Sequence, residues 1–273
     1  MIWESRTGVG GLLKTEPDWV PGKVKTKMKK LMFVATAALC AAVGFGDITS
    51  QNVVGYNTLN TSNPTVMLGC SFRTMIGDDA MKLSAIQGDF ESMDEIQVSY
   101  LTDDGFIEFN VYQYLTTDDG VDANGWYDGS WETAGDVEIP RGSAVWFSSS
   151  TAKNLTSSGE VVKSETIHPA FTESTVMICS AYPIAFNPNA DTVAWNGLSS
   201  MDEIQVAYMT EDGFIEFNVY QWLTEDDGVA ETAWYDGSWE KIVDPIAVIG
   251  QGFWLSMADC ESVTMVETSP LAK

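Results

Sequence analysis

The chain has 273 residues, of which 39 are acidic and 14 basic, with one histidine and four cysteines. A formal net charge of −25 argues against nucleic acid and anionic lipid surfaces as partners, because both are bound through clustered Lys and Arg. His168 is the single imidazole, so a His-rich metal site is excluded, and a Ser/His/Asp or Cys/His nucleophile would depend on this one residue. The length and the 45% of apolar residues allow one large or two small domains with real cores.

Residues 28–46 have the order of a secretory signal peptide: a basic start, an apolar run at 31–43 and then small residues. The apolar run is too short to span a bilayer. We expect the chain to start at Met28, after an upstream extension, and to be cleaved after Gly46. The mature chain then keeps 36 acidic and seven basic residues, a net charge of −29. It is expected in the periplasm, at the cell surface or in the medium, without insertion into a membrane.

The next feature along the chain is an internal repeat. Residues 92–132 and 200–240 are identical at 32 of 41 positions, at an offset of 108 residues. Shorter matches extend the likeness: 65–67 with 175–177, Cys70 with Cys179, Gly142 with Gly250, and Trp146 with Trp254. Two copies are too few for a solenoid or propeller. The sequence therefore predicts two β modules at 47–158 and 159–273.

The hydrophobic period in each copy is two, which predicts strands. Residues 102–105 predict a four-residue hairpin loop, which would place Val98 opposite Phe109 and Ile96 opposite Val111. All apolar pairs would then share one sheet face. Apart from a short turn at 83–86, the mature chain has no helical periodicity. We expect an all-β fold, with an antiparallel β-sandwich or small barrel in each module.

A tighter hairpin is predicted at 126–131, because Asp128-Gly129 is a strong two-residue turn signal. This turn would place Trp126 across from Trp131, and the second copy repeats the pattern around Asp236-Gly237.

Aromatic and amide side chains around these hairpins suggest a surface on which sugar rings stack. The candidate ligand-binding residues are Trp126, Tyr127, Trp131, Asn110, Tyr112 and Tyr114 in the first module, and Trp234, Tyr235, Trp239, Asn218, Tyr220 and Trp222 in the second. The favoured alternative is that these aromatics cover the sheet or the contact between modules. Polar residues such as Gln97, Glu108 and Asn110 are identical in both copies, which a ligand, a module contact or recent duplication would explain.

Acidic loops offer a weaker hypothesis, a bound calcium ion. The candidate ligands are Asp103, Asp104, Asp118, Asp119, Asp226 and Asp227, and their spacing does not match a calcium-binding loop. Ordinary turn chemistry explains Asp at such positions, so we expect no cofactor.

Catalysis has little support in the sequence. Glu108 and Glu216 are the first candidates for a glycan hydrolase, but a solvated strand face explains them better. His168 has no counterpart in the first module. We expect that the protein is not an enzyme.

Three cysteines remain after cleavage, and export permits disulfides. Cys179 with Cys260 is slightly favoured, because these residues would join the first and last strands of the second module. Cys70 with Cys179 is the alternative. An odd count leaves one thiol unpaired or intermolecular.

Several short motifs occur in a characteristic order behind the signal peptide. They are Gln-Asn-Val-Val-Gly-Tyr at 51–56, Leu-Ser-x-Ile-Gln-Gly at 83–88, Asp-Glu-Ile-Gln-Val at 94–98, W-Y-D-G-x-W at 126–131, Gly-Glu-Val at 159–161 and Gly-x-Gly-Phe-Trp at 250–254. The chain thereby resembles a family of exported bacterial proteins of unknown function built from Asn-Val-Val-Gly-Tyr-led β modules. The second module departs from the pattern, with Lys163-Ser164 in place of Gly-Tyr. The resemblance implies export and β modules and transfers no site residue.

The sequence thus predicts a secreted, non-enzymatic β-repeat protein of the cell envelope or surface. Its expected role is structural or adhesive, with weak binding of polysaccharide or other envelope components. A hydrolase with paired carboxylates and a calcium-dependent assembly module are the alternatives.

Overall fold

The computed structural model describes residues 53–61, 65–74, 77–102, 104, 106–258 and 262–272. The predicted signal peptide lies outside these ranges. The all-β prediction is confirmed: every strand pair in the sheets is antiparallel, and the described helices are three single 3-10 turns, η1 (Leu83–Ala85), η2 (Thr117–Asp119) and η3 (Glu225–Asp227). Among the described residues, no helix has the length and apolar character needed to cross a bilayer.

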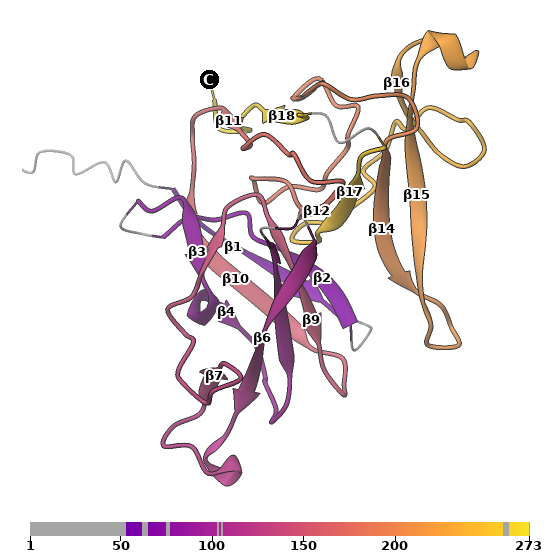
Figure 1. Cartoon of the computed structure of the whole chain (residues 1–273). Coiled ribbons are helices and arrows are strands. Elements are labelled where there is room, and N and C mark those ends of the chain that lie inside the picture. The colour runs from indigo at the N-terminus through magenta and orange to yellow at the C-terminus, as the bar shows by residue number, and fades with distance from the viewer. Residues whose placement is uncertain are drawn as a thin grey trace, which may run out of the picture. The chain divides into compact units, whose positions relative to one another are not determined.

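The first repeat packs a five-stranded sheet against a three-stranded sheet (Figure 1). The larger sheet has the order β2 (Thr65–Gly69), β9 (Ala144–Ser148), β5 (Glu95–Leu101), β6 (Ile107–Leu115), β7 (Gly125–Tyr127), and the smaller has the order β1 (Val53–Asn60), β10 (Asn154–Val161), β4 (Ile86–Gln87). A third pair joins β3 (Ala80–Lys82) to β8 (Glu138–Pro140). Leu59 and Leu155 meet Ile96, Val145 and Phe147 in the core, which gives a β-sandwich-like unit. Strand β10 pairs with β1 along its whole length, so the predicted module boundary after residue 158 falls inside β10.

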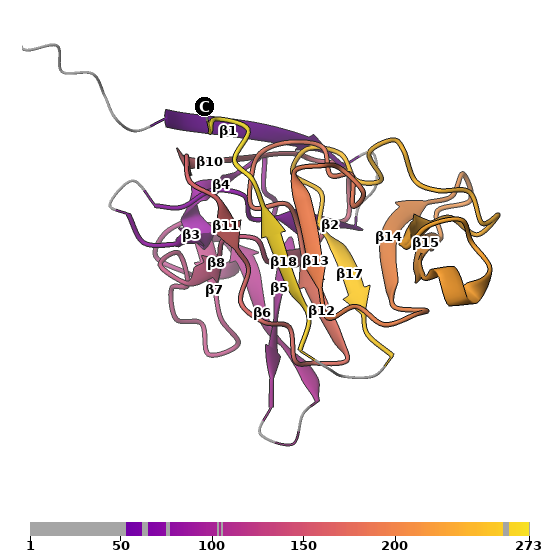
Figure 2. The same ribbon diagram turned by 90° about the horizontal axis from the view of Figure 1, so that it is seen from above.

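The second repeat has the same two sheets. The five-stranded sheet is β12 (Thr175–Ile178), β17 (Phe253–Ser256), β14 (Glu203–Met209), β15 (Ile215–Leu223), β16 (Ala233–Tyr235), and the three-stranded sheet is β11 (Thr166–Ile167), β18 (Thr264–Glu267), β13 (Val193–Asn196). Figure 2 shows β13 and β18 side by side. Phe253, Ile204 and Met265 lie in the core between these sheets.

The register of the first hairpin differs from the predicted one by one residue. In the structure Val98 lies opposite Asn110, and Ile96 lies opposite Tyr112. The cause is the turn: the Thr102 N–H donates to the Phe106 carbonyl oxygen at 2.9 Å, so the loop between the paired residues is one residue shorter than predicted.

A shift of one residue moves a strand's side chains to the opposite sheet face. Ile107, Phe109 and Val111 therefore lie on the face away from Ile96 and Val98, and the prediction that all apolar pairs share one face is wrong. The second hairpin pairs in the same way, since the Thr210 N–H donates to Phe214 at 2.9 Å.

The turn after β7 is also longer than the predicted two residues. Asp128 Oδ1 accepts hydrogen bonds from the backbone N–H groups of Ser130 and Glu132, at 2.8 and 3.0 Å. The Asp128 N–H in turn donates to Glu132, so three residues form the loop. Trp126 consequently lies opposite Ala134 instead of Trp131.

The two repeats join through equivalent contacts in both directions. Leu68 of β2 bridges to Gln251, and Ile178 of β12 bridges to Ser143. The Gly69 N–H donates to Gly250, and the Cys179 N–H donates to Gly142, each at 2.8 Å. An approximate two-fold axis therefore relates the repeats, and Gly69 is the spatial counterpart of Cys179.

The outer faces of the two five-stranded sheets form a further cluster around this axis, in which Met67, Ala144 and Met177 are buried. Two glycines lie at its closest approaches. A Cβ on Gly69 would be 2.6 Å from Cys179 Cβ, and a Cβ on Gly252 would be 2.3 Å from Ala144 Cβ. Each close pair joins equivalent positions of the two repeats. Two modules that both carried a Cβ at these positions would clash, and one glycine in each pair removes the clash.

Candidate functional site

The centre of the predicted aromatic surface is buried. Trp126 is 5% exposed and Trp234 fully buried, and Tyr127 and Tyr235 are also in the core. Trp126 packs edge-on against Phe90, with ring centroids 4.9 Å apart. The prediction that Trp126, Tyr127, Trp234 and Tyr235 offer a platform for sugar rings is therefore corrected: their rings fill the cores.

Neighbouring aromatics on the strands share this role. The Tyr114 ring lies 5.5 Å from Trp126, and the Trp222 ring lies 5.6 Å from Trp234. Tyr112 and Tyr220 are half-buried against the same cores. The register shift explains the difference, because it turns these even-numbered side chains toward the core face. Asn110, Asn218, Trp131 and Trp239 remain exposed.

Large apolar side chains are nevertheless exposed at matching positions of both repeats. The five pairs of identical residues are Met93 and Met201, Tyr100 and Tyr208, Phe106 and Phe214, Val111 and Val219, and Trp131 and Trp239. We call this set the duplicated surface. Core packing does not explain the identity of exposed side chains, and sequence analysis missed Met93 and Phe106 because they stand outside the alternating pattern.

Two pairs of the duplicated surface have strained backbones. Trp131 and Trp239 have φ values of 65° and 63°, and Met93 and Met201 both have 70°. Bulky side chains seldom adopt this left-handed region, which glycine and asparagine occupy more easily. Trp131 and Trp239 are the last residues of three-residue hairpin loops, a position that adopts the left-handed conformation as part of the loop geometry. Their side chains are 59% and 55% exposed.

A tyrosine and a glutamate pair across each main hairpin. The Tyr100 hydroxyl donates to Glu108 Oε2 at 2.5 Å, and the Tyr208 hydroxyl donates to Glu216 Oε2 at 2.6 Å. The carboxylate as hydrogen-bond acceptor raises the pKa of each tyrosine. Each pair holds one carboxylate, whereas glycoside hydrolysis places two carboxyl groups around one bond. The arrangement is that of a cross-strand surface contact.

A groove of about 500 Å³ lies between β6 and the loop after β7. Phe109, Asn110, Val111 and Tyr112 line one side, and Asp128, Gly129, Glu132, Thr133, Ala134 and Val137 line the rest. Burial and the negative charge of Asp128 raise the pKa of Tyr112, so the phenol stays neutral. The groove brings Asn110 and Tyr112, two of the predicted ligand-binding residues, together with Asp128 and Glu132. The sequence did not point to these two acidic residues as candidates for ligand binding.

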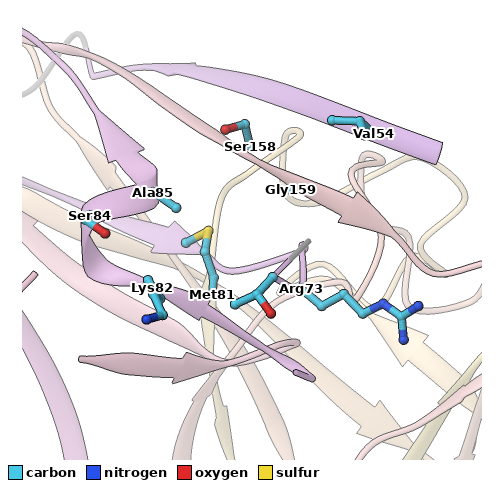
Figure 3. A pocket seen from close by; sticks show the side chains of 9 residues that line it. Val54, Arg73, Met81, Lys82, Ser84, Ala85, Ser158 and Gly159 are labelled. Atoms are coloured by element: carbon cyan, nitrogen blue, oxygen red, sulfur yellow. The ribbon is translucent and has the colours of Figure 1, made fainter. Parts of the chain in front are cut away.

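A smaller hollow of about 320 Å³ lies beside β10 and β3 (Figure 3). Its cations already have partners: Arg73 makes two hydrogen bonds of 3.0 Å to Glu160, and Lys82 lies 2.9 Å from Asp136. Figure 3 shows both charged groups pointing away from Met81 and Ala85. The aliphatic parts of Arg73 and Lys82 line the hollow. Because both charged groups are already paired, the hollow offers an anion no unpaired cation from these residues.

Two predicted calcium ligands hold turns of the chain. Asp119 Oδ2 accepts hydrogen bonds from the backbone N–H and hydroxyl of Thr116, at 2.7 and 2.8 Å, and Asp227 does the same with Thr224. Across the described ranges, no three His, Cys, Asp or Glu side chains are grouped to hold a metal ion. Asp103 lies outside those ranges, and Asp104, Asp118 and Asp226 are not part of such a group.

These hydrogen bonds predict a pH dependence of stability. They lower the pKa of Asp119 and Asp227, the backbone N–H groups contributing most, so the ionised carboxylates stabilise the fold near neutral pH. This contribution is lost as the pH falls through the lowered values. Asp119→Asn/Asp227→Asn should therefore have a lower Tm at neutral pH and a smaller decrease in Tm between about pH 5 and pH 3. Asp118→Asn/Asp226→Asn is the matched control. The prediction would be contradicted if the Tm of wild type and that of Asp119→Asn/Asp227→Asn fell equally as the pH is lowered.

His168 belongs to a buried network between the repeats. Its Nε2 lies 2.7 Å from Glu267 Oε1, while the Ser180 hydroxyl and Ala181 N–H donate to the same carboxylate at 2.6 and 2.8 Å. The serine bonds the glutamate and not the histidine, so the order differs from that of a catalytic triad. A Cβ on Gly142 would lie 2.4 Å from the His168 ring, which shows how closely this network meets the first repeat.

Cys70 and Cys179 are free, buried thiols in the structure. The Cys179 thiol donates to the carbonyl oxygens of Ser143 and Ser180, each at 3.2 Å. This differs from the expected Cys179–Cys260 disulfide, although Cys260 itself lies outside the described residues. The backbone pairing of Cys179 with the first repeat orients its side chain toward that repeat.

Burial predicts that both thiols are unreactive. It raises the pKa of Cys179 to about 12 and that of Cys70 well above its usual value. At pH 9 only about one Cys179 thiol in a thousand is then ionised, and the thiolate is the reactive form. A mature Cys260→Ser chain should resist iodoacetamide when folded and take up two labels in urea, as mass spectrometry would show. Labelling of the folded chain at the rate of an exposed thiol would contradict the burial.

In comparisons with protein-family models, curated proteins and solved structures, nothing matches this chain. The candidate site therefore rests on the geometry of the duplicated surface and of the groove beside β6.

Proposed function

We propose that this chain is an exported, non-enzymatic protein of the cell envelope or surface with an adhesive or structural role. It attaches through the duplicated surface, which presents the same side chains twice on one body. Export rests on the signal-peptide pattern at 28–46.

The duplicated surface is the observation that carries this proposal. Its five pairs of exposed apolar residues are identical in both repeats and lie within 92–132 and 200–240, where 32 of 41 positions are identical. Trp131 and Trp239 combine this identity with large exposed fractions. Two similar contact sites on one body favour attachment to a repetitive or multivalent target, because the second contact forms at a high effective concentration.

Retention on isolated cell envelopes, with a polysaccharide panel in parallel, tests the proposal. Trp131→Asn/Trp239→Asn removes both indoles, and asparagine tolerates the positive φ. Tyr56→Ala removes an exposed aromatic that belongs to no matching pair. We expect wild type and the Tyr56 variant to be retained, and the double variant to be released.

Three outcomes are informative. Retention on polysaccharide that the double variant loses would identify sugar as the target. Equal retention of wild type and double variant would contradict attachment through the duplicated surface. Release of reducing sugar by wild type that Glu108→Gln/Glu216→Gln abolishes would replace the proposal with a hydrolase.

A further inference from the structure

Strand β6 leaves most of one edge unpaired. It pairs with β5 from Ile107 to Gln113, but with β7 only from Gln113 to Leu115. Strand β15 is equivalent, with pairing to β16 restricted to 221–223. Figure 1 shows β16 beside one end of β15 only. No strand of the described chain pairs with the outer edge at 107–112 or 215–220.

The free backbone groups belong to the odd-numbered residues. Phe106 and Tyr114 bond inward, to Thr102 and Asp94 of the β5 side. Antiparallel pairs alternate between bonded and non-bonded residues, so the even positions of β6 bond to β5. The N–H and C=O groups of Ile107, Phe109 and Val111 therefore point outward. In β15 the inward bonds of Phe214 and Trp222 leave Ile215, Phe217 and Val219 in the same position.

These edges lack two of the usual guards against pairing, lysine and proline. The loop after β7 lies across the groove from β6 without pairing to it. The two segments are Ile-Glu-Phe-Asn-Val-Tyr, identical in both repeats and without lysine or proline. An added strand would meet an apolar row on one face, Ile107, Phe109 and Val111. On the core-side face it would meet Glu108, Asn110 and the half-buried Tyr112.

The charge around the groove indicates which kind of strand would bind to the edge of β6. Asp128 and Glu132 lie across the groove from β6, and Glu108 lies on its core-side face. The mature chain carries a net charge of −29, so a second copy would be repelled. A strand with lysine or arginine at alternate positions would match both the carboxylates and the apolar row.

We propose that the outer edges of β6 and β15 each bind an extended basic segment of a partner polypeptide as an added β-strand. Main-chain hydrogen bonds provide the affinity in this mode, and alternate side chains provide the selectivity. The proposal rests on the adhesive function and names its partner class.

The two edges differ in the charge beside them. Lys241 and Ile242 replace Thr133 and Ala134 of the first groove, and Lys241 lies 2.8 Å from Glu231. A cation at this position reduces the attraction for a basic strand. The β6 edge is therefore the tighter of the two sites.

A labelled peptide, Lys-Val-Lys-Val-Lys-Val-Lys, tests the proposal by fluorescence anisotropy. Valines on the apolar face would direct their N–H groups to β6, and lysines would direct theirs to solvent. N-methylation of the valines should weaken binding at least about tenfold, whereas N-methylation of the lysines should change it less than about threefold. Equal effects of the two modifications would overturn strand addition.

Protein variants give an independent test. Val111→Pro/Val219→Pro removes outward N–H groups, and such positions on edge strands tolerate proline. Glu108→Lys/Glu216→Lys reverses exposed charges in case proline disturbs the fold. Each should weaken peptide binding about tenfold or more, since it removes a donor or a complementary charge. Unchanged binding to both would overturn the proposal.

Other occupants give distinct results. Dimerisation of wild type without peptide, lost in Val111→Pro/Val219→Pro, would assign the edges to a second copy and overturn the proposal. Binding of polysaccharide in the groove without any peptide binding would also overturn it. If Val111→Pro/Val219→Pro is still retained on envelopes, the adhesive function does not depend on strand addition. If wild type binds the peptide but is not retained on envelopes, only the adhesive function is refuted.

Discussion

Gly252→Ala is expected to lower the free energy of unfolding by about 1–3 kcal/mol, the usual cost of overpacking a buried site. The added Cβ would lie 2.3 Å from Ala144 Cβ and 2.9 Å from Met67 Cγ, so the two repeats would have to move apart. The φ of Gly252 is not positive, so the loss reflects crowding and not backbone strain. Urea denaturation of the mature chain measures the change.

The exchange variant Gly252→Ala/Ala144→Gly isolates this contact. It moves the one methyl group of the pair to the other repeat. Glycine in strand β9 costs about 0.5–1 kcal/mol by itself. The exchange should nevertheless recover most of the stability, with a coupling energy of about 1 kcal/mol or more. Strictly additive losses would contradict an approximate two-fold axis at this contact.

Glu267→Ala is expected to cost about 3–5 kcal/mol, the range for removing one partner of a buried polar pair. Glu267 is 2% exposed and accepts bonds from Ser180 and Ala181, with His168 Nε2 at 2.7 Å. The alanine variant leaves these three buried groups without an acceptor, and each such loss costs about 1–3 kcal/mol. Urea denaturation measures the loss.

Two further variants show what the network requires. Glu267→Gln keeps the shape and one acceptor oxygen, so its loss should be smaller than that of alanine. Glu240→Ala removes an exposed carboxylate of the same repeat and should change stability by less than about 0.5 kcal/mol. If Glu267→Ala lowers the free energy of unfolding by less than about 1 kcal/mol, which is roughly a fivefold change in the folding equilibrium, the network contributes little to stability.

The strands and the duplication were predictable because both depend on local patterns. Alternation at Ile96 and Val98 marks a strand, and 41 aligned residues establish the repeat. The hairpin register was not predictable from alternation alone. Thr102 pairs with Phe106 and shortens the first loop by one residue, while Asp128 binds two backbone N–H groups and lengthens the second.

The candidate site was predicted only in part for the same reason. Asn110 and Trp131 are exposed, as a ligand-binding surface requires, but Trp126 and Trp234 are buried because the true register turns β7 and β16 toward the cores. The contacts of Gly69 with Cys179 and of Gly252 with Ala144 join residues about 110 positions apart. No local pattern specifies such pairs, since they depend on how the two finished sheets pack.

The central claim is that one body presents the same attachment surface twice. Dissociation from immobilised cell envelopes tests it most directly, with wild type compared with Trp131→Asn, Trp239→Asn and the double variant. Two linked sites predict that either single variant dissociates at least about tenfold faster than wild type, and that the double variant is not retained. Single variants that dissociate at the wild-type rate, or a double variant that is still retained, would contradict the claim.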